Sequence, residues 1–120
     1  MTDLIYLASP YHHADPEVME QRFRAVARMA GRLMLEGHVV YSPIVHCHPI
    51  ASMINLPRDW AFWEWFDRTM LARCDAVWIA KLPGWESSKG VSAEMRIAEE
   101  LGLPITWIDP AAGDQGAVDG

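Results

Sequence analysis

The sequence predicts a single α/β domain of three layers, with helices on both faces of a parallel sheet of four to five strands. Short apolar runs of strand length alternate along the chain with longer segments whose apolar residues recur every three or four positions. Gly, Pro, Ser and Asp residues stand between many of these segments. Strands that alternate with helices favour parallel pairing through right-handed crossovers, as in Rossmann-like and flavodoxin-like domains.

The chain begins with a predicted strand and a long predicted helix. Residues Leu4–Ala8 form an apolar run closed by a Ser-Pro pair, which is typical of a buried parallel strand. Asp15 and Pro16 have the residue types of a helix N-cap and first turn. The helical spacing of apolar residues continues to Gly37, where we expect the helix to end.

A second strand and an unusually long connection follow. Residues His38–Ser42 have the pattern of a strand, which Pro43 stops. Between Ile44 and Pro57 we expect a loop, and its length makes it a candidate functional segment. Residues Arg58–Arg73 are predicted to form the second helix.

The remaining segments complete the alternation. We expect a strand over Asp75–Ala80, a loop over Leu82–Lys89, a helix over Gly90–Leu101 and a strand over Pro104–Ile108. The domain then covers residues 1–109, and residues 110–120 are predicted to form a flexible C-terminal tail. Parallel α/β sheets bind ligands beyond the C-terminal ends of their strands, so the loops at that edge form the candidate site.

Composition narrows the classes of function. With 120 residues, of which 51% are hydrophobic and 22% charged, the chain has the composition of a folded soluble domain. A net charge of −6, with Lys81 and Lys89 as its only lysines, argues against a duplex nucleic acid as partner. No apolar run has the length of a membrane span, and two cysteines without a pairing pattern fit the cytoplasm. We therefore expect a cytoplasmic protein that binds a small molecule.

Common motifs for phosphate binding and nucleophilic catalysis do not occur. The chain has no G-x-G-x-x-G after its first strand, no G-x-x-x-x-G-K-[ST] and no G-x-S-x-G. Histidines gather at positions 12–13 and 46–48, where a His-x-His spacing could hold a metal ion or give only a polar loop. No carboxylate completes a ligand set, so we expect no metal site.

Two carboxylates stand on otherwise apolar helix faces. Asp67 shares its face with Trp60, Trp63, Met70 and Cys74, and Glu94 shares its face with Val91, Met95, Ala98 and Leu101. A buried carboxylate is costly unless it is paired, so each side chain needs a partner. Asp67 could lie at the edge of its stripe and bond to a backbone amide or to Arg58 or Arg68. Glu94 could be a partly exposed residue that pairs with Arg96 or Arg73. Alternatively, both flank the cleft at the strand ends, where two carboxylates in unlike surroundings suit the cleavage of a glycosidic bond.

A polar segment leads directly into the helix that carries Glu94. Ser87, Ser88, Lys89 and Gly90 combine small residues and one positive charge at a helix N-terminus, which suits a bound phosphate. The two serines could equally act only as helix caps.

Several of these residues together resemble a known group of enzymes. The motifs are Ile5–Pro10, Asp67 and Asp75 with seven residues between them, and Ser88-x-Gly90-Val91-x-x-Glu94, in this order. Over residues 4–108 the chain resembles the nucleoside 2-deoxyribosyltransferase-like superfamily, which includes the 2′-deoxynucleoside 5′-phosphate N-hydrolases. Its length and its Leu82–Trp85 loop are similar to those of a small uncharacterised branch, a domain of unknown function.

The resemblance implies a role for each matching residue. Glu94 corresponds to the nucleophile that attacks the anomeric carbon, and Tyr6 to the tyrosine that holds this carboxylate. Asp67 corresponds to the acid that protonates the departing base, and Asp75 is then structural. A serine at position 88, six residues before Glu94, implies a 5′-phosphate on the substrate and water as the acceptor. The remaining expected substrate contacts are Ser9, Pro10, Tyr11, Ser87, Gly90 and Trp63.

The sequence thus predicts an N-glycosyl hydrolase or 2-deoxyribosyltransferase that cleaves the base–sugar bond of a (deoxy)nucleoside 5′-monophosphate without metal or organic cofactor. The alternative is a nucleotide-binding or sensing module with the same cleft and no turnover. The resemblance also implies a homodimer or higher homo-oligomer. We expect the helix over Arg58–Arg73 at its interface, because this helix carries more apolar surface than one core face needs.

Overall fold

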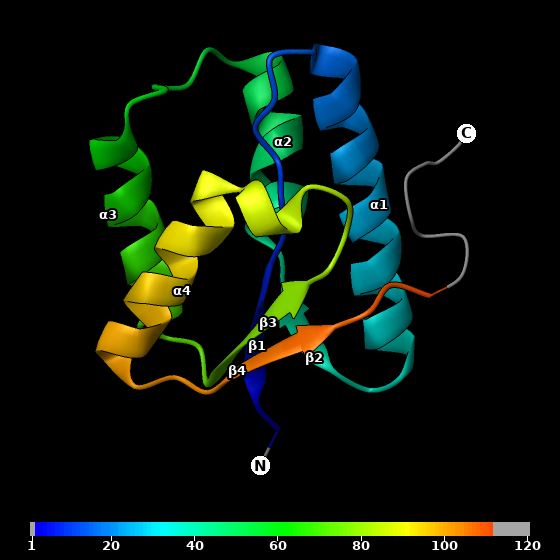
Figure 1. Ribbon diagram of the computed structural model, residues 1–120, viewed down its shortest axis with the longest axis vertical. Coiled ribbons are helices and arrows are strands. Elements are labelled where there is room, and N and C mark those ends of the chain that lie inside the picture. Colours follow the sequence, from blue (N-terminus) through cyan, green and yellow to red (C-terminus); the bar gives the residue numbers. More distant parts are fainter. Residues whose placement is uncertain (1, 112–120) are drawn as a thin grey trace.

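Four parallel strands form the central sheet of the structure, a computed structural model that describes residues 2–111 (Figure 1). The elements are β1 (Leu4–Ala8), α1 (Pro16–Leu35), β2 (Val39–Tyr41), α2 (Pro43–Met53), α3 (Trp60–Leu71), β3 (Ala76–Ala80), the short 3₁₀ helix η1 (Trp85–Ser87), α4 (Lys89–Leu101) and β4 (Ile105–Ile108). The strands lie in the order β2-β1-β3-β4, and every neighbouring pair is parallel. The predicted α/β fold is confirmed. Most of the predicted tail, residues 112–120, lies outside the described residues.

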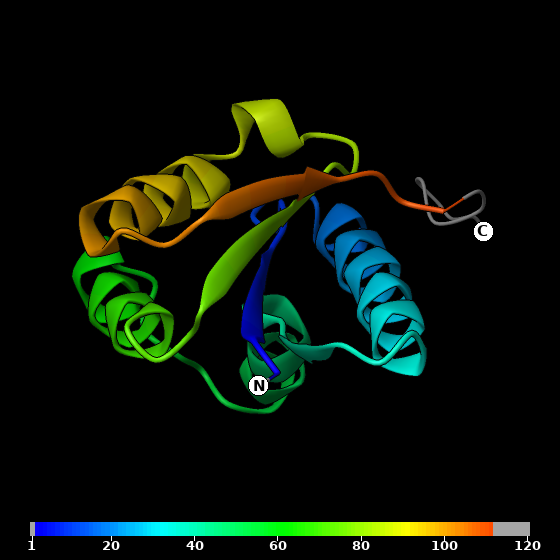
Figure 2. The same ribbon diagram turned by 90° about the horizontal axis from the view of Figure 1, so that it is seen from below.

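Helices cover both faces of this sheet, as Figure 2 shows. α1 packs on one face, and α3 and α4 pack on the other. Along β1 the side chains alternate between the two faces, with Leu7 in the apolar cluster under α1 and with Tyr6 and Ala8 in the cluster under α3 and α4. Among residues 2–111, no helix has both the length and the apolar character that a membrane crossing requires.

The loop predicted over residues 44–57 is wrong, because residues Pro43–Met53 form α2. The side chain of Ser42 caps this helix by accepting the backbone N–H of Val45 at 3.2 Å, and Pro43 occupies the first turn, where its fixed φ is favourable. From the sequence, Pro43 is expected only to stop the preceding strand. A second proline, Pro49, lies inside α2 without ending it.

The C-terminal ends of β1 and β3 lie side by side, and the chain leaves them toward opposite faces of the sheet. After β1 it passes into α1, and after β3 it passes through η1 into α4. Open α/β sheets bind ligands at such a switch in connection. At the opposite edge, the Asp75 carboxylate accepts the backbone N–H of Leu4 at 2.7 Å, which is the structural role expected for it.

Candidate active site

A buried tyrosine of β1 meets a buried glutamate of α4 on the face covered by α3 and α4. The Tyr6 hydroxyl donates a hydrogen bond of 2.6 Å to Oε2 of Glu94, and the two residues are 0% and 6% exposed. Ser88 caps α4 by accepting the backbone N–H of Val91, which fixes where the helix begins. Glu94 follows Val91 by three residues and therefore shares its buried face.

Asp67 of α3 completes a cluster of three polar side chains. Its partly buried carboxyl group lies within hydrogen-bonding reach of both the Tyr6 hydroxyl and the Glu94 carboxyl group. Two nearby arginines bind elsewhere, since Arg68 pairs with Glu64 and Glu100 and Arg73 donates to the carbonyl of Thr69. The two carboxyl groups that the sequence places on apolar faces are therefore each other's neighbours.

Burial sets the protonation of this cluster. It raises the pKa of Glu94 well above its ordinary value, and the charge of Asp67 raises it further. Burial raises the pKa of Asp67 from 3.8 to about 6, against the opposing effect of hydrogen bonds from Tyr6 and Glu94. The pKa of Tyr6 is also raised well above its usual range by burial and by Glu94, so its hydroxyl stays neutral. The carboxyl pair therefore keeps a proton to a higher pH than two separate exposed carboxyl groups would, and the deeper burial of Glu94 favours that residue as its holder.

Tyr41, a residue that sequence reasoning missed, stands beside this cluster at the C-terminal end of β2. It is the register partner of Tyr6, and the two ring centroids are 5.6 Å apart. Its buried hydroxyl has no hydrogen-bond partner among the described residues. Cys47 of α2 lies close to the cluster as well, and burial followed by the charge of Asp67 raises the pKa of its thiol to about 11. The register of β1 and β2 would have been needed to find Tyr41.

The segment after β1 is held by a chain of side chains from three elements. The Tyr11 hydroxyl and Nδ1 of His48 are 2.7 Å apart, and Nε2 of His48 lies 2.8 Å from the Glu20 carboxylate. His48 thus joins this segment to α1 and α2, and the residues of the described chain include no group of three His, Cys, Asp or Glu side chains placed to hold a metal ion. Ser9 and Pro10 are buried, and the Ser9 hydroxyl has no partner among residues 2–111.

The other expected substrate contacts lie on two segments around the same edge of the sheet. Ser88 is the N-cap of α4, and the Ser87 hydroxyl donates to the carbonyl of Gly84 at 3.4 Å. Gly90 is exposed in the first turn of α4. Trp63 is only partly buried, and its indole N–H donates to the carbonyl of Pro57 at 2.8 Å, which ties α3 to the segment before it.

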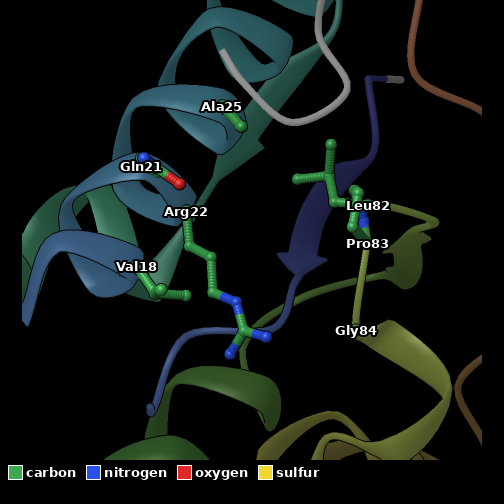
Figure 3. A pocket seen from close by; sticks show the side chains of 7 residues that line it. All are labelled: Val18, Gln21, Arg22, Ala25, Leu82, Pro83 and Gly84. Carbon is green, nitrogen blue, oxygen red and sulfur yellow. The ribbon is translucent and has the colours of Figure 1, made fainter. Parts of the chain in front are cut away.

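A cavity of about 220 Å³ lies on the α1 side of this edge, outside the carboxyl cluster. It is lined by Val18, Gln21, Arg22, Ala25, Leu82, Pro83 and Gly84, as Figure 3 shows. The Arg22 guanidinium donates to the carbonyls of Tyr11 and His12, at 3.4 and 2.9 Å. It also touches Gly84, whose positive φ of 94° and lack of a side chain allow this contact. Arg22 therefore joins the segment after β1 to the segment after β3.

Comparison with known proteins places these features in a family and a fold. The family model described as "Domain of unknown function (DUF1937)" matches residues 3–109. No curated protein matches the sequence. Among solved structures, a 2-deoxyribosyltransferase from the psychrotolerant bacterium Bacillus psychrosaccharolyticus is similar, with 21% sequence identity and a TM-score of 0.65. The match covers 98% of this chain and 77% of that protein, so the two share the nucleoside 2-deoxyribosyltransferase-like fold.

Proposed function

Because the chain belongs to the DUF1937 family and has the fold of a 2-deoxyribosyltransferase, we propose that it cleaves the bond between base and sugar in a (deoxy)nucleoside 5′-monophosphate. The observation that carries this proposal is the contact between the Glu94 and Asp67 carboxyl groups beside the hydroxyl of Tyr6. Two carboxyl groups whose surroundings hold their pKa values apart suit the paired roles of nucleophile and acid.

In the first step, Glu94 is the nucleophile and Asp67 is the acid. The one proton of the pair moves from Glu94 to Asp67 across their contact, which leaves Glu94 as a carboxylate. A Glu94 oxygen then bonds to C1′, the C1′–N bond breaks, and the departing nitrogen takes the proton from Asp67. The neutral Tyr6 hydroxyl donates to Glu94 throughout and stabilises its charge in the ionised state.

In the second step, water attacks C1′ and releases Glu94. The C1′–O bond to Glu94 breaks, its electron pair returns to the carboxylate, and Asp67 takes a proton from the water. The sugar keeps its configuration at C1′. Retaining enzymes hold their two carboxyl groups about 5–5.5 Å apart, and inverting enzymes about 6.5–9.5 Å apart. Asp67 and Glu94 lie within hydrogen-bonding reach in the free protein, so this course requires the bound substrate to part them to the shorter of these separations.

The 5′-phosphate would bind at the N-terminus of α4, next to Ser87, Ser88 and Gly90. The free backbone N–H groups of a helix N-terminus favour an anion. Ser88 uses its oxygen as a cap acceptor, so its hydroxyl proton is still available to a phosphate oxygen. The Arg22 guanidinium lies at the same edge of the sheet and adds positive charge there.

A panel of potential substrates tests this proposal. The protein is incubated with the four 2′-deoxynucleoside 5′-monophosphates, with the matching nucleosides and with the ribonucleotides, and released base is quantified by chromatography. We expect release from at least one deoxynucleotide, faster than from its nucleoside. Intact-mass measurement of rapidly quenched samples should detect the glycosyl–Glu94 ester. A protein that releases base from no member of the panel does not have the proposed activity.

A second candidate function is a nucleotide-binding module without turnover. It is favoured by the burial of Glu94, which is 6% exposed, and by the position of the 220 Å³ cavity outside the carboxyl cluster. Nucleotide binding measured by calorimetry, together with the absence of base release, would support this function over the enzyme.

We also propose that the chain forms a homodimer or a higher homo-oligomer through α3 and the end of α2. Large apolar side chains are exposed there, with exposed fractions of 87% for Met53, 62% for Ile54 and 62% for Trp65. Light scattering at micromolar concentration should give a mass above 13.5 kDa. Trp65→Glu should lower that mass, whereas the same change at the exposed Trp107 of β4 should leave it unchanged. A monomeric wild-type protein would contradict the proposal.

A further inference from the structure

The Tyr41 hydroxyl is a buried polar group that the mechanism above does not use. Its oxygen is shielded from solvent and has no hydrogen-bond partner among residues 2–111. Burying a hydroxyl without a partner costs about 1–3 kcal/mol, and a folded protein rarely accepts this cost without a reason. Replacing this tyrosine by phenylalanine would remove the cost, so the hydroxyl needs an explanation outside the free protein's own stability.

The surroundings of Tyr41 indicate that its hydroxyl serves the proposed reaction centre. Its ring lies against the ring of Tyr6, whose hydroxyl binds Glu94. Tyr41 is the register partner of Tyr6 and packs against the same buried cluster, so its ring lies on the face of the sheet where Tyr6 meets the carboxyl groups. The backbone is fixed on either side of it, by pairing with β1 and by the cap of α2 at Ser42.

Resting on the proposed function, we propose that, once a bound substrate has parted the carboxyl groups, the Tyr41 hydroxyl holds the water molecule that releases the sugar from Glu94. The phenol is neutral, because burial raises its pKa well above the usual range. A neutral hydroxyl can accept a hydrogen bond from a bound water molecule. The other proton of the water points to Asp67. The water thus has one lone pair directed at C1′ and both hydrogens bonded.

Atoms and charges balance in this step. The water oxygen bonds to C1′ as the bond from C1′ to Glu94 breaks, and its electron pair returns to the Glu94 carboxylate. One proton of the water moves to Asp67, and the other stays on the new C1′ hydroxyl, hydrogen-bonded to Tyr41. Tyr41 itself gains and loses no proton, so it is a positioning residue for water. It makes no contact required by the first step, in which the base leaves.

Tyr41→Phe tests this proposal, because it removes one oxygen and keeps the ring that packs on Tyr6. With the deoxynucleotide that the wild type cleaves fastest, the variant should release about one equivalent of base per site in a rapid burst. Steady-state release should then be roughly 10–100-fold slower than in the wild type, since only the attack of water is impaired. Its thermal midpoint should equal or exceed that of the wild type, because the free protein loses no hydrogen bond.

Added methanol separates a water-positioning role from a general defect. An alcohol can attack C1′ in place of water, so the variant should give a larger share of methyl glycoside than the wild type does. A burst and a steady state that fall together, an unchanged steady-state rate or a lowered thermal midpoint would each overturn the proposal for Tyr41. A wild type that releases no base refutes the proposed function itself, and this inference with it.

Discussion

Glu94→Gln exchanges one oxygen of a buried side chain for an amide nitrogen and keeps its size. The protonated Glu94 side chain accepts a hydrogen bond from Tyr6 and lies within donating distance of Asp67, and glutamine can make the same contacts. The variant should therefore fold and bind substrate. It has no carboxylate that can bond to C1′, so base release should fall at least ~10³-fold, or about 4 kcal/mol in the barrier.

The same substitution should change the pH dependence of stability. In the unfolded chain Glu94 ionises near its ordinary pKa, whereas burial in the folded protein raises that pKa well above it. The folded protein then binds more protons than the unfolded chain, so stability falls as pH rises. Each pH unit over which this difference persists costs about 1.4 kcal/mol, and roughly 5–6 °C in thermal midpoint for a domain of this size. Glutamine removes this loss.

Calorimetric thermal midpoints from pH 5 to pH 8 measure the effect, with Glu99→Gln as the control because Glu99 is an exposed residue of the same helix. The midpoint of Glu94→Gln should rise relative to the wild type as pH increases, and that of Glu99→Gln should run parallel to the wild type. Parallel curves for both variants would refute the buried, protonated state of Glu94. Base release by Glu94→Gln within severalfold of the wild type would refute its role as nucleophile.

Three further predictions concern the neighbouring groups. The value of kcat/KM should fall below about pH 6, where Asp67 is protonated as well and can no longer take the proton of Glu94. A profile that is flat across pH 6 would contradict this. Tyr6→Phe removes the donor 2.6 Å from the nucleophile and should lower base release ~10–100-fold and the free energy of unfolding by about 1–3 kcal/mol, measured with denaturant; wild-type values would count against the contact. Gly84→Ala should lower the thermal midpoint, because alanine is strained at a φ of 94° and its Cβ, 2.5 Å from Nη2 of Arg22, would displace that guanidinium. Gly90→Ala should cost less, because Gly90 lies in α4 and its Cβ would meet nothing closer than 3.8 Å; equal midpoints for the two variants would contradict the backbone strain expected at position 84.

Most of the fold could be predicted because its patterns are local. The first helix begins with an Asp-Pro pair and ends at Leu35, two residues before Gly37, which has a positive φ of 101°. The helix α2 could not be predicted in this way. Its apolar residues are not confined to one stripe, and it contains Pro49, so neither its periodicity nor its composition indicates a helix. Its start depends on Ser42, which also ends a strand pattern.

Some residues of the candidate site could likewise be predicted from the sequence, and others could not. Asp67 and Glu94 stand out in the sequence because a charge on an apolar stripe needs a partner. Tyr41 could not be found, since its place beside the carboxyl groups depends on which strand pairs with β1 and in which register. The link between Tyr11 and His48 was equally hidden, because it requires α2 to exist and to lie against α1.

The proline within α2 affects how easily this helix opens compared with α4. Pro49 has no backbone N–H, so the turn around it lacks one bond of the helical ladder, and Pro43 is the only residue of α2 that is buried. Amide hydrogens of α2 should therefore exchange faster with deuterium than those of α4, which buries five residues (Val91, Ala93, Glu94, Ile97 and Ala98). Glu94 would then lie on the more protected of these two helices, and Cys47 and His48 on the less protected one. In the proposed reaction, movement of α2 could admit bases of different size while the backbone around Glu94 stays in place.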